Sequence, residues 1–218
     1  MVINSNTNLA DVHNINNIVQ HPFSVDEIST YDIREAIDEH PLARKPTNIR
    51  SKIAYKAIMS QIKPSSRYLL PGWISVFTYS EPKFKADLEY YDATPLVVSL
   101  GIIRTKENVI REIGVNLHYF PPYTRYNIMS TIYNEFKPYF NKYFNDPSQK
   151  PNTFISYESL KRVMRRNQKL AFAIKMYVPV LRGKTYILPT RLLSTAMYTE
   201  GHFSKATLQQ IFKFWRQF

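Results

Sequence analysis

The chain has 218 residues and a net charge of +12, from 29 Lys and Arg against 17 Asp and Glu. With 44% apolar and 21% charged residues, its composition is that of a folded globular protein, which excludes wholesale disorder. It contains no cysteine, which excludes disulfides, thiol nucleophiles and cysteine-based zinc or iron–sulfur sites. An excess of positive charge this large suits a polyanionic partner, either nucleic acid or an anionic membrane surface.

The N-terminal part is predicted to hold an arm and two helices. Residues 1–20 are rich in Asn and low in charge, so we expect a flexible arm that becomes ordered only against a neighbour. The helical segment follows over residues 21–66. Ser24 and Glu27 form a capping box that starts its first helix, and apolar residues at helical spacing predict a second helix over Asn48–Ile62.

Residues 67–150 are predicted to hold a small β-structure and the helix after it. The alternating stretch Leu70–Tyr79 predicts a strand, and the continuous apolar run Pro95–Ile103 predicts a strand buried on both faces. A third strand is predicted over Ile113–Phe120, after a hairpin-like loop at Thr105–Val109. Three or four antiparallel strands with short connections indicate a strongly bent sheet or an SH3-like barrel.

The rest of the chain is predicted to be mostly helical. Helices are expected over Tyr123–Phe144, Phe154–Met176 and, at the C-terminus, Ser204–Phe218, while Tyr177–Leu188 predicts a strand hairpin. The predicted fold class is therefore α+β. A small SH3-like barrel or bent antiparallel sheet is flanked by helices, and residues 151–218 form a basic helical C-terminal region.

Most of the net charge lies in this C-terminal region. Residues 151–218 hold 12 Lys or Arg and two acids, whereas the first 150 residues have a net charge of only +2. Within Leu160–Ile174, apolar residues fall on one helical face and five cations on the opposite face. A phosphate backbone would relieve the repulsion among these cations and release counterions. The residues assigned to nucleic-acid binding are Lys161, Arg162, Arg165, Arg166, Lys169, Lys175 and Arg182.

Two other interpretations of the cationic face stay open. It could be a solvated face or a surface for a protein partner, or it could lie on a membrane. Membrane-surface helices usually carry Trp, Phe or several Leu on the apolar side, and the apolar side here is modest. Nucleic acid is therefore the preferred partner.

The C-terminal helix carries aromatic residues among its cations. Such residues can stack on single-stranded bases. Docking of a terminal helix into a core or a neighbouring subunit is the more common use of several aromatics. We therefore assign partner binding to Phe212, Trp215 and Phe218.

No catalytic, metal or cofactor site is predicted. The sequence lacks the nucleophile-elbow, P-loop, dinucleotide-binding and zinc-protease motifs, and no two histidines have metal-ligand spacing. An acidic cluster between Asp26 and Glu39 lacks the strand-borne carboxylates that a two-metal nuclease needs. His118 is predicted to be a hydrogen-bonded structural residue in the third strand.

Three ordered segments resemble a family of tailed-phage proteins. The segments are Pro71-Gly-Trp-Ile-Ser-Val-Phe-Thr-Tyr, Tyr90-Tyr-Asp-Ala-Thr-Pro-Leu-Val and Gly114-Val-Asn-Leu-His-Tyr-Phe-Pro-Pro. They are similar to a pattern found in DNA end protector and head-completion proteins, and Ala93-Thr94 stands where an aromatic is more usual. The resemblance extends over Leu70–Phe144 and, more loosely, over the C-terminal third.

The resemblance implies a non-enzymatic virion component, made in the host cytoplasm, that binds DNA largely independently of sequence. The bound DNA would be the packaged genome end near the portal. Other virion proteins would be further partners, the protein could form an oligomer within the particle, and no membrane would be involved. The alternatives are a head–tail connector or tail protein that acts through protein contacts, and a nuclease.

Overall fold

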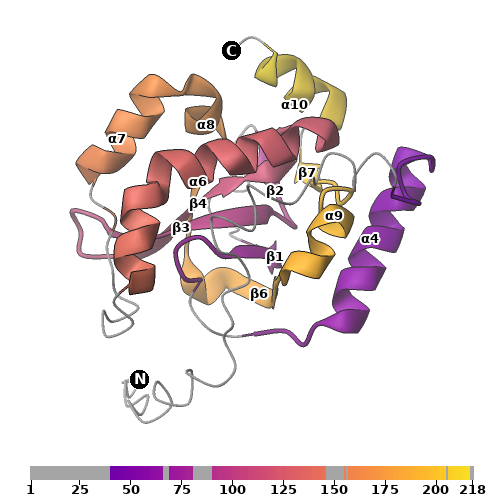
Figure 1. Ribbon diagram of the computed structural model, residues 1–218, viewed down its shortest axis with the longest axis horizontal. Coiled ribbons are helices and arrows are strands. Elements are labelled where there is room, and N and C mark those ends of the chain that lie inside the picture. Colours follow the sequence, from indigo (N-terminus) through magenta and orange to yellow (C-terminus); the bar gives the residue numbers. More distant parts are fainter. Residues whose placement is uncertain are drawn as a thin grey trace.

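The computed structural model describes residues 40–65, 69–80, 90–145, 155, 157–204 and 206–216 (Figure 1). The predicted arm over residues 1–20 and the first predicted helix lie outside the described residues. Most of the stretch between the helices predicted over residues 123–144 and 154–176 also lies outside them.

A five-stranded antiparallel sheet forms the centre of the fold. Its strands follow the order β5-β4-β3-β1-β6. They are β1 (Ile74–Tyr79), β3 (Leu96–Arg104), β4 (Ile110–Asn116), β5 (Ile174–Tyr177) and β6 (Arg182–Ile187). A second, two-stranded sheet pairs β2 (Tyr91–Asp92) with β7 (Phe203–Ser204).

Helices cover the sheet and complete an α+β fold, as predicted. The α-helices are α4 (Thr47–Gln61), α6 (Pro122–Asn145), α7 (Tyr157–Arg166), α8 (Gln168–Ala173), α9 (Leu193–Ala196) and α10 (Leu208–Trp215). Short 3-10 turns are η2 (Leu117–Tyr119), η3 (Pro179–Leu181) and η4 (Thr190–Leu192). In Figure 1, α6 crosses in front of the sheet, with α4 and α9 toward one end and α7 and α8 toward the other. None of the helices among the described residues is long and apolar enough to span a membrane.

The two faces of the sheet bury different apolar clusters. Ile74 and Val76 of β1 belong to the larger cluster, whereas Phe77 and Tyr79 belong to the smaller one. This division confirms the alternation predicted for β1. Along β3 every residue except Arg104 is buried, which confirms the prediction of a strand covered on both faces.

The third predicted strand is too long at its C-terminal end. β4 ends at Asn116, and Leu117–Tyr119 form a 3-10 turn. The side-chain oxygen of Asn116 accepts a hydrogen bond from the backbone N–H of His118 at 3.0 Å. This local bond takes the place of the hydrogen bonds that would continue the strand. Asn side chains commonly bond to nearby backbone groups in this way.

The long helix predicted over Phe154–Met176 is divided in the structure. α7 ends at Arg166, and the side-chain oxygen of Asn167 caps the next helix by accepting from the backbone N–H of Leu170 at 3.2 Å. The chain then becomes extended at Ile174. The apolar and cationic faces nevertheless stay on opposite sides, because both short helices pack on the same core.

The predicted hairpin over Tyr177–Leu188 is wrong. β5 pairs with β4, and β6 pairs with β1, so the two strands lie at opposite edges of the sheet. Only Val178 and η3 join them. The five strands are not closed into a barrel, since among the described residues β5 and β6 do not pair with each other.

Candidate nucleic-acid interface

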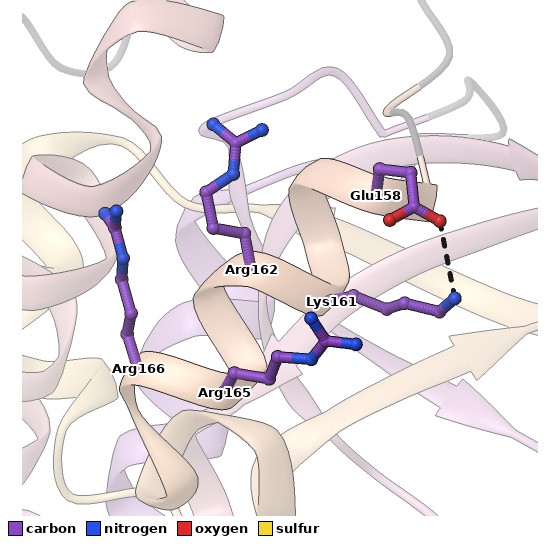
Figure 2. Close-up of a pocket in the computed structure, with 5 residues that line it drawn as sticks. All are labelled: Glu158, Lys161, Arg162, Arg165 and Arg166. Carbon is purple, nitrogen blue, oxygen red and sulfur yellow. Dashed lines mark hydrogen bonds and ion pairs between the residues drawn. The ribbon is translucent and has the colours of Figure 1, made fainter.

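Four of the five cations of the predicted cationic face line one hollow on α7, and together with Lys169 of α8 we call them the α7 surface. Figure 2 shows Arg162 and Arg166 extending from one side of the helix and Lys161 reaching toward Glu158. The α7 cations and Glu158 line an open hollow of about 270 Å³. Arg162, Arg165 and Arg166 are exposed. The α7 surface comprises Lys161, Arg162, Arg165, Arg166 and Lys169, the last of these on α8.

The core fixes the orientation of this surface. Leu160 and Val163, on the opposite side of α7, are 4% and 7% exposed, and Leu170 of α8 is fully buried. These residues belong to the larger apolar cluster. Turning the helix would expose them, so the cations are held toward solvent.

The α7 surface carries little compensating negative charge. Glu158 Oε1 lies 3.3 Å from Lys161 Nζ, and this exposed ion pair is of a kind that contributes little to stability. Within the part of the chain that the structure describes, no acid pairs with Arg162, Arg165 or Arg166. A bound anion would therefore meet three guanidinium groups that have no acidic partner among the described residues.

Two further predicted binding residues make contacts of another kind. The Nζ atom of Lys175 lies 4.5 Å from the centroid of the Tyr119 ring, and burial lowers the pKa of this amine to about 8. Arg182 Nε lies 2.8 Å from Glu112 Oε2, and both side chains are almost fully buried. The role of Lys175 and Arg182 in DNA binding stays a prediction. Their contacts with Tyr119 and Glu112 show that both side chains also interact within the folded chain.

The aromatic residues assigned to partner binding are described only in part. Phe212 is half-buried and packs against the larger apolar cluster beside the buried Ile211 of the same helix. The side chain of Trp215 and the whole of Phe218 lie outside what the structure describes. Partner binding by these residues stays a prediction.

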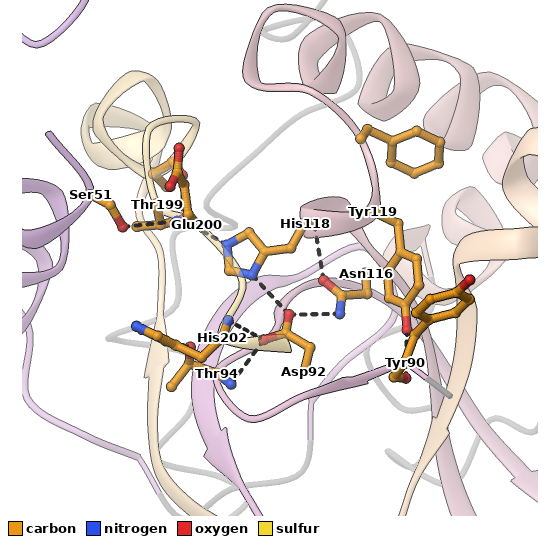
Figure 3. A network of polar contacts seen from close by, with 12 residues as sticks. Ser51, Tyr90, Asp92, Thr94, Asn116, His118, Tyr119, Thr199, Glu200 and His202 are labelled. Carbon is orange, nitrogen blue, oxygen red and sulfur yellow. Dashed lines mark hydrogen bonds and ion pairs between the residues drawn. The ribbon is translucent and has the colours of Figure 1, made fainter. Parts of the chain in front are cut away.

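Sequence reasoning missed a buried polar network centred on Asp92 (Figure 3). Asp92 Oδ2 accepts hydrogen bonds from Asn116 Nδ2 and His118 Nδ1, both at 2.9 Å. Its Oδ1 accepts from the backbone N–H groups of Thr94 at 3.1 Å and His202 at 3.0 Å. Asp92, Asn116 and His118 all come from the segments that carry the phage resemblance. Those segments therefore share a structural purpose, which is to join β2 to the end of β4 and to the segment before β7.

Burial and charge act against each other in this network. Burial lowers the pKa of His118, and the neighbouring Asp92 carboxylate opposes that shift only in part. Burial alone would raise the pKa of Asp92, but the charge and hydrogen bond of His118, together with the bonds from Asn116 and Thr94, lower it instead. The prediction that His118 is a hydrogen-bonded structural residue is confirmed, although it lies in η2 rather than in a strand.

Asp92, His118 and Thr199 have the side-chain chemistry of a catalytic triad. His118 Nε2 lies 3.0 Å from Thr199 Oγ1. His118 and Thr199 are both fully buried, and the hydroxyl donates to the carbonyl oxygen of Ala196 at 2.7 Å. A substrate has no access to this hydroxyl, so the arrangement acts as a structural clamp.

Arg125 holds the other side of the same segment. Its guanidinium is fully buried and donates to the carbonyl oxygens of Phe120, Met197 and Thr199. Burial lowers its pKa to about 10. Arg125 and Asp92 together fix residues 197–202 against α6 and β2.

The sequence matches the model of a bacteriophage protein family over residues 14–183. That family is described as the phage T4 terminal DNA protecting protein, and because the match covers well over half of the chain, the chain belongs to this family. No curated protein and no solved structure matches the chain significantly. The family confirms the predicted class of function, a bacteriophage protein that acts on DNA, and fits a location in the virion or the infected cell. The matched span includes the α7 surface, Asp92 and His118.

Proposed function

We propose that this protein protects the ends of phage DNA by binding them, without catalysing a reaction, and that the α7 surface contacts the DNA phosphates. One observation carries the proposal. Arg162, Arg165 and Arg166 are exposed and have no acidic partner among the described residues, on a helix whose other face is locked into the core.

Phosphate contacts account for binding that is largely independent of sequence. Arginines that neutralise phosphates release condensed counterions, and this term is the same for every base sequence. The α7 surface is an open helix face, so it can follow the backbone of a double helix without enclosing it. Protection then requires only that the bound protein covers the terminus, and no bond in the DNA has to be broken.

We also propose that the five-stranded sheet is an opened SH3-like barrel. Four strand spacings of about 4.8 Å would separate β5 from β6 by about 19 Å in a flat sheet. The link between them contains the 3-10 turn Pro179–Leu181, and such a turn rises only about 2 Å per residue. A connection this short between the two edge strands supports a strongly curved sheet.

Within the particle, we place the protein at the packaged genome end near the portal, beside other virion proteins. The resemblance to head-completion proteins supports this location. The C-terminal aromatic residues Phe212, Trp215 and Phe218 are the proposed contacts with those neighbours.

The test is protection of linear duplex DNA from an exonuclease by the purified protein. Replacing Arg162, Arg165, Arg166 and Lys169 by Gln should remove protection and weaken binding to all sequences alike. Each lost phosphate contact should make the negative slope of log K against log salt less steep by about 0.9.

The matched control removes four exposed cations from other parts of the surface, as Gln variants of Lys45, Lys106, Lys137 and Lys184. Equal losses in the control and in the α7 variant would show that only net charge matters and would end the assignment to α7. Metal-dependent DNA cleavage by the protein, abolished by a single carboxylate substitution, would refute the non-enzymatic function.

A further inference from the structure

A second cationic surface lies on and around α4. In Figure 1, α4 and α7 lie toward opposite ends of the molecule, so neither surface extends the other. Residues 40–65 contain six Lys or Arg and no acid. Five of the six are exposed. These five are Arg44, Lys45, Lys52, Lys56 and Lys63.

A groove of about 770 Å³ runs along this helix. Lys52 and Lys56, one helical turn apart, line one wall together with Tyr55, and Thr94 and His202 line the other. Sites for small ligands usually measure about 300–1,000 Å³. The groove therefore has the size of a site for one or a few nucleotide units and is too small to admit a double helix.

A flat ring is held at a fixed angle in the wall of the groove. The exposed imidazole of His202 stacks on the ring of Tyr55, with centroids 5.8 Å apart and planes at 28°. His202 Nδ1 hydrogen-bonds to Thr94 Oγ1. Tyr55 is fixed in turn, because its hydroxyl donates to the carbonyl oxygen of Glu200 at 2.9 Å. The ring is thus already oriented before a ligand arrives.

Among the described residues, Glu200 is the one acid that lines the groove, and it does little to repel an anion. Glu200 Oε1 lies 3.6 Å from Arg50 Nη2, so its charge is compensated. Burial also raises the pKa of Glu200. The field along the groove is therefore dominated by Lys52 and Lys56.

We propose that this groove binds the unpaired terminal nucleotides of a DNA strand, with Lys52 and Lys56 on phosphates and His202 stacked on a base. A cationic groove with aromatic rings is the general device for binding single strands, and His is among the side chains that stack on bases. The inference rests on the proposed function, and it adds how an end is distinguished from the interior of a duplex. Unpaired nucleotides occur where a duplex frays or carries a tail, and an intact interior offers none.

The experiment compares two DNA molecules of equal duplex length by fluorescence anisotropy. One is a linear duplex with short single-stranded tails, and the other is a covalently closed duplex circle, which has no terminus and no unpaired nucleotides. The combined variant Lys52→Gln and Lys56→Gln should lower affinity for the tailed duplex about tenfold and leave affinity for the closed circle within about twofold. His202→Ala should act in the same direction, and His202→Phe, which keeps a flat ring, should restore most of the affinity.

The matched control is Lys45→Gln with Lys63→Gln, which removes two exposed charges near α4 but outside the groove. If this control weakens the tailed duplex as much as the groove variant does, or if the groove variant weakens both DNAs equally, the groove is not a strand-end site. Unchanged affinity of the groove variant for tailed DNA, with loss of assembly into particles, would assign the groove to a protein partner and overturn the proposal. Failure of the proposed function looks different, because wild-type protein would then bind neither DNA and the α7 variant would change nothing.

Discussion

His118 Nδ1 and Asp92 Oδ2 lie 2.9 Å apart, with the two side chains 0% and 2% exposed. This contact joins the turn after β4 to the short strand β2 and, through the backbone N–H of His202, to the chain before β7. Three separate parts of the chain therefore depend on one carboxylate. The first predictions concern this relationship.

Asp92→Asn should destabilise the fold strongly. The carboxylate accepts four hydrogen bonds, whereas an amide offers one oxygen and turns its own N–H groups toward donors. Breaking one side of a buried pair costs about 3–5 kcal/mol, and urea unfolding would measure the loss. In a double-mutant cycle with His118→Gln, the double variant should lose less unfolding free energy than the sum of the two single losses, since the residues share one contact. Simple additivity would show that the pair is not coupled.

Acid should destabilise the protein in two steps. The folded-state pKa values of His118 and Asp92 are both lowered, so the unfolded chain binds more protons than the folded one. A fall in pH therefore stabilises the unfolded state relative to the folded state. The His118 contribution is complete above about pH 6.5 and is lost below it, and that of Asp92 is lost below about pH 3.9. The groups that act on His118 are Asp92, Arg125 and His202.

The measurement is the urea midpoint between pH 7.5 and pH 5. His118→Gln should flatten this profile without abolishing it, because burial also lowers the pKa of His40 and adds a slope of the same sign. An equally steep profile in the variant would contradict the assignment to His118.

Arg125→Met should unfold more easily than the wild type. Its loss leaves the carbonyl oxygens of Phe120, Met197 and Thr199 without their donor in a buried site. Unsatisfied buried groups cost about 1–3 kcal/mol each. Lys137→Met, at an exposed position of the same helix, is the control and should stay within about 0.5 kcal/mol of wild type in thermal unfolding.

Two glycines of the sheet should respond differently to Ala. A Cβ on Gly114 would lie 2.7 Å from the carbonyl oxygen of Val98, and a backbone atom cannot rotate away. At Gly183, which is exposed, the nearest atom is the hydroxyl of Thr78, whose side chain can turn. We expect Gly114→Ala to cost about 1–3 kcal/mol and Gly183→Ala clearly less. Equal thermal shifts in the two variants would refute this account.

Removing the cations of the α7 surface should leave the fold intact. Exposed substitutions usually change stability by about 0.5 kcal/mol or less, and fewer like charges on one helix face reduce repulsion. Thermal unfolding of the variant with Gln at positions 162, 165, 166 and 169 should therefore match that of wild type or exceed it slightly. A large fall in its midpoint would mean that lost DNA binding reports unfolding.

The periodicity of apolar residues along the sequence predicted several helices and strands correctly. The helical spacing of Asn48–Ile62, the alternation of Leu70–Tyr79 and the apolar run of Pro95–Ile103 each predicted one element, and the structure has α4, β1 and β3 within a few residues of these bounds. The pairing of β6 with β1 could not be predicted, since a strand pattern does not name its partner. The turn at Leu117–Tyr119 alternates like a strand, and the cap from Asn116 overrides that pattern.

The candidate sites were predictable to different degrees. The α7 surface follows from the spacing of its charges along Leu160–Ile174, a segment predicted as one helix and divided into α7 and α8 in the structure. The network of Asp92 joins residues as far along the chain as His202, and no local window contains them together. A charge count over residues 40–65 alone would have indicated the cationic surface on α4. The sum over the first 150 residues conceals it, because the acidic cluster between Asp26 and Glu39 cancels these cations.

The pairing of β1 with β6 sets the order in which the fold can form during synthesis. Val76 aligns with Tyr186 and Ser75 with Ile187, so β1 waits for more than a hundred further residues before its outer edge is covered. Until then the emerging chain presents an uncovered strand edge, which favours association with other chains.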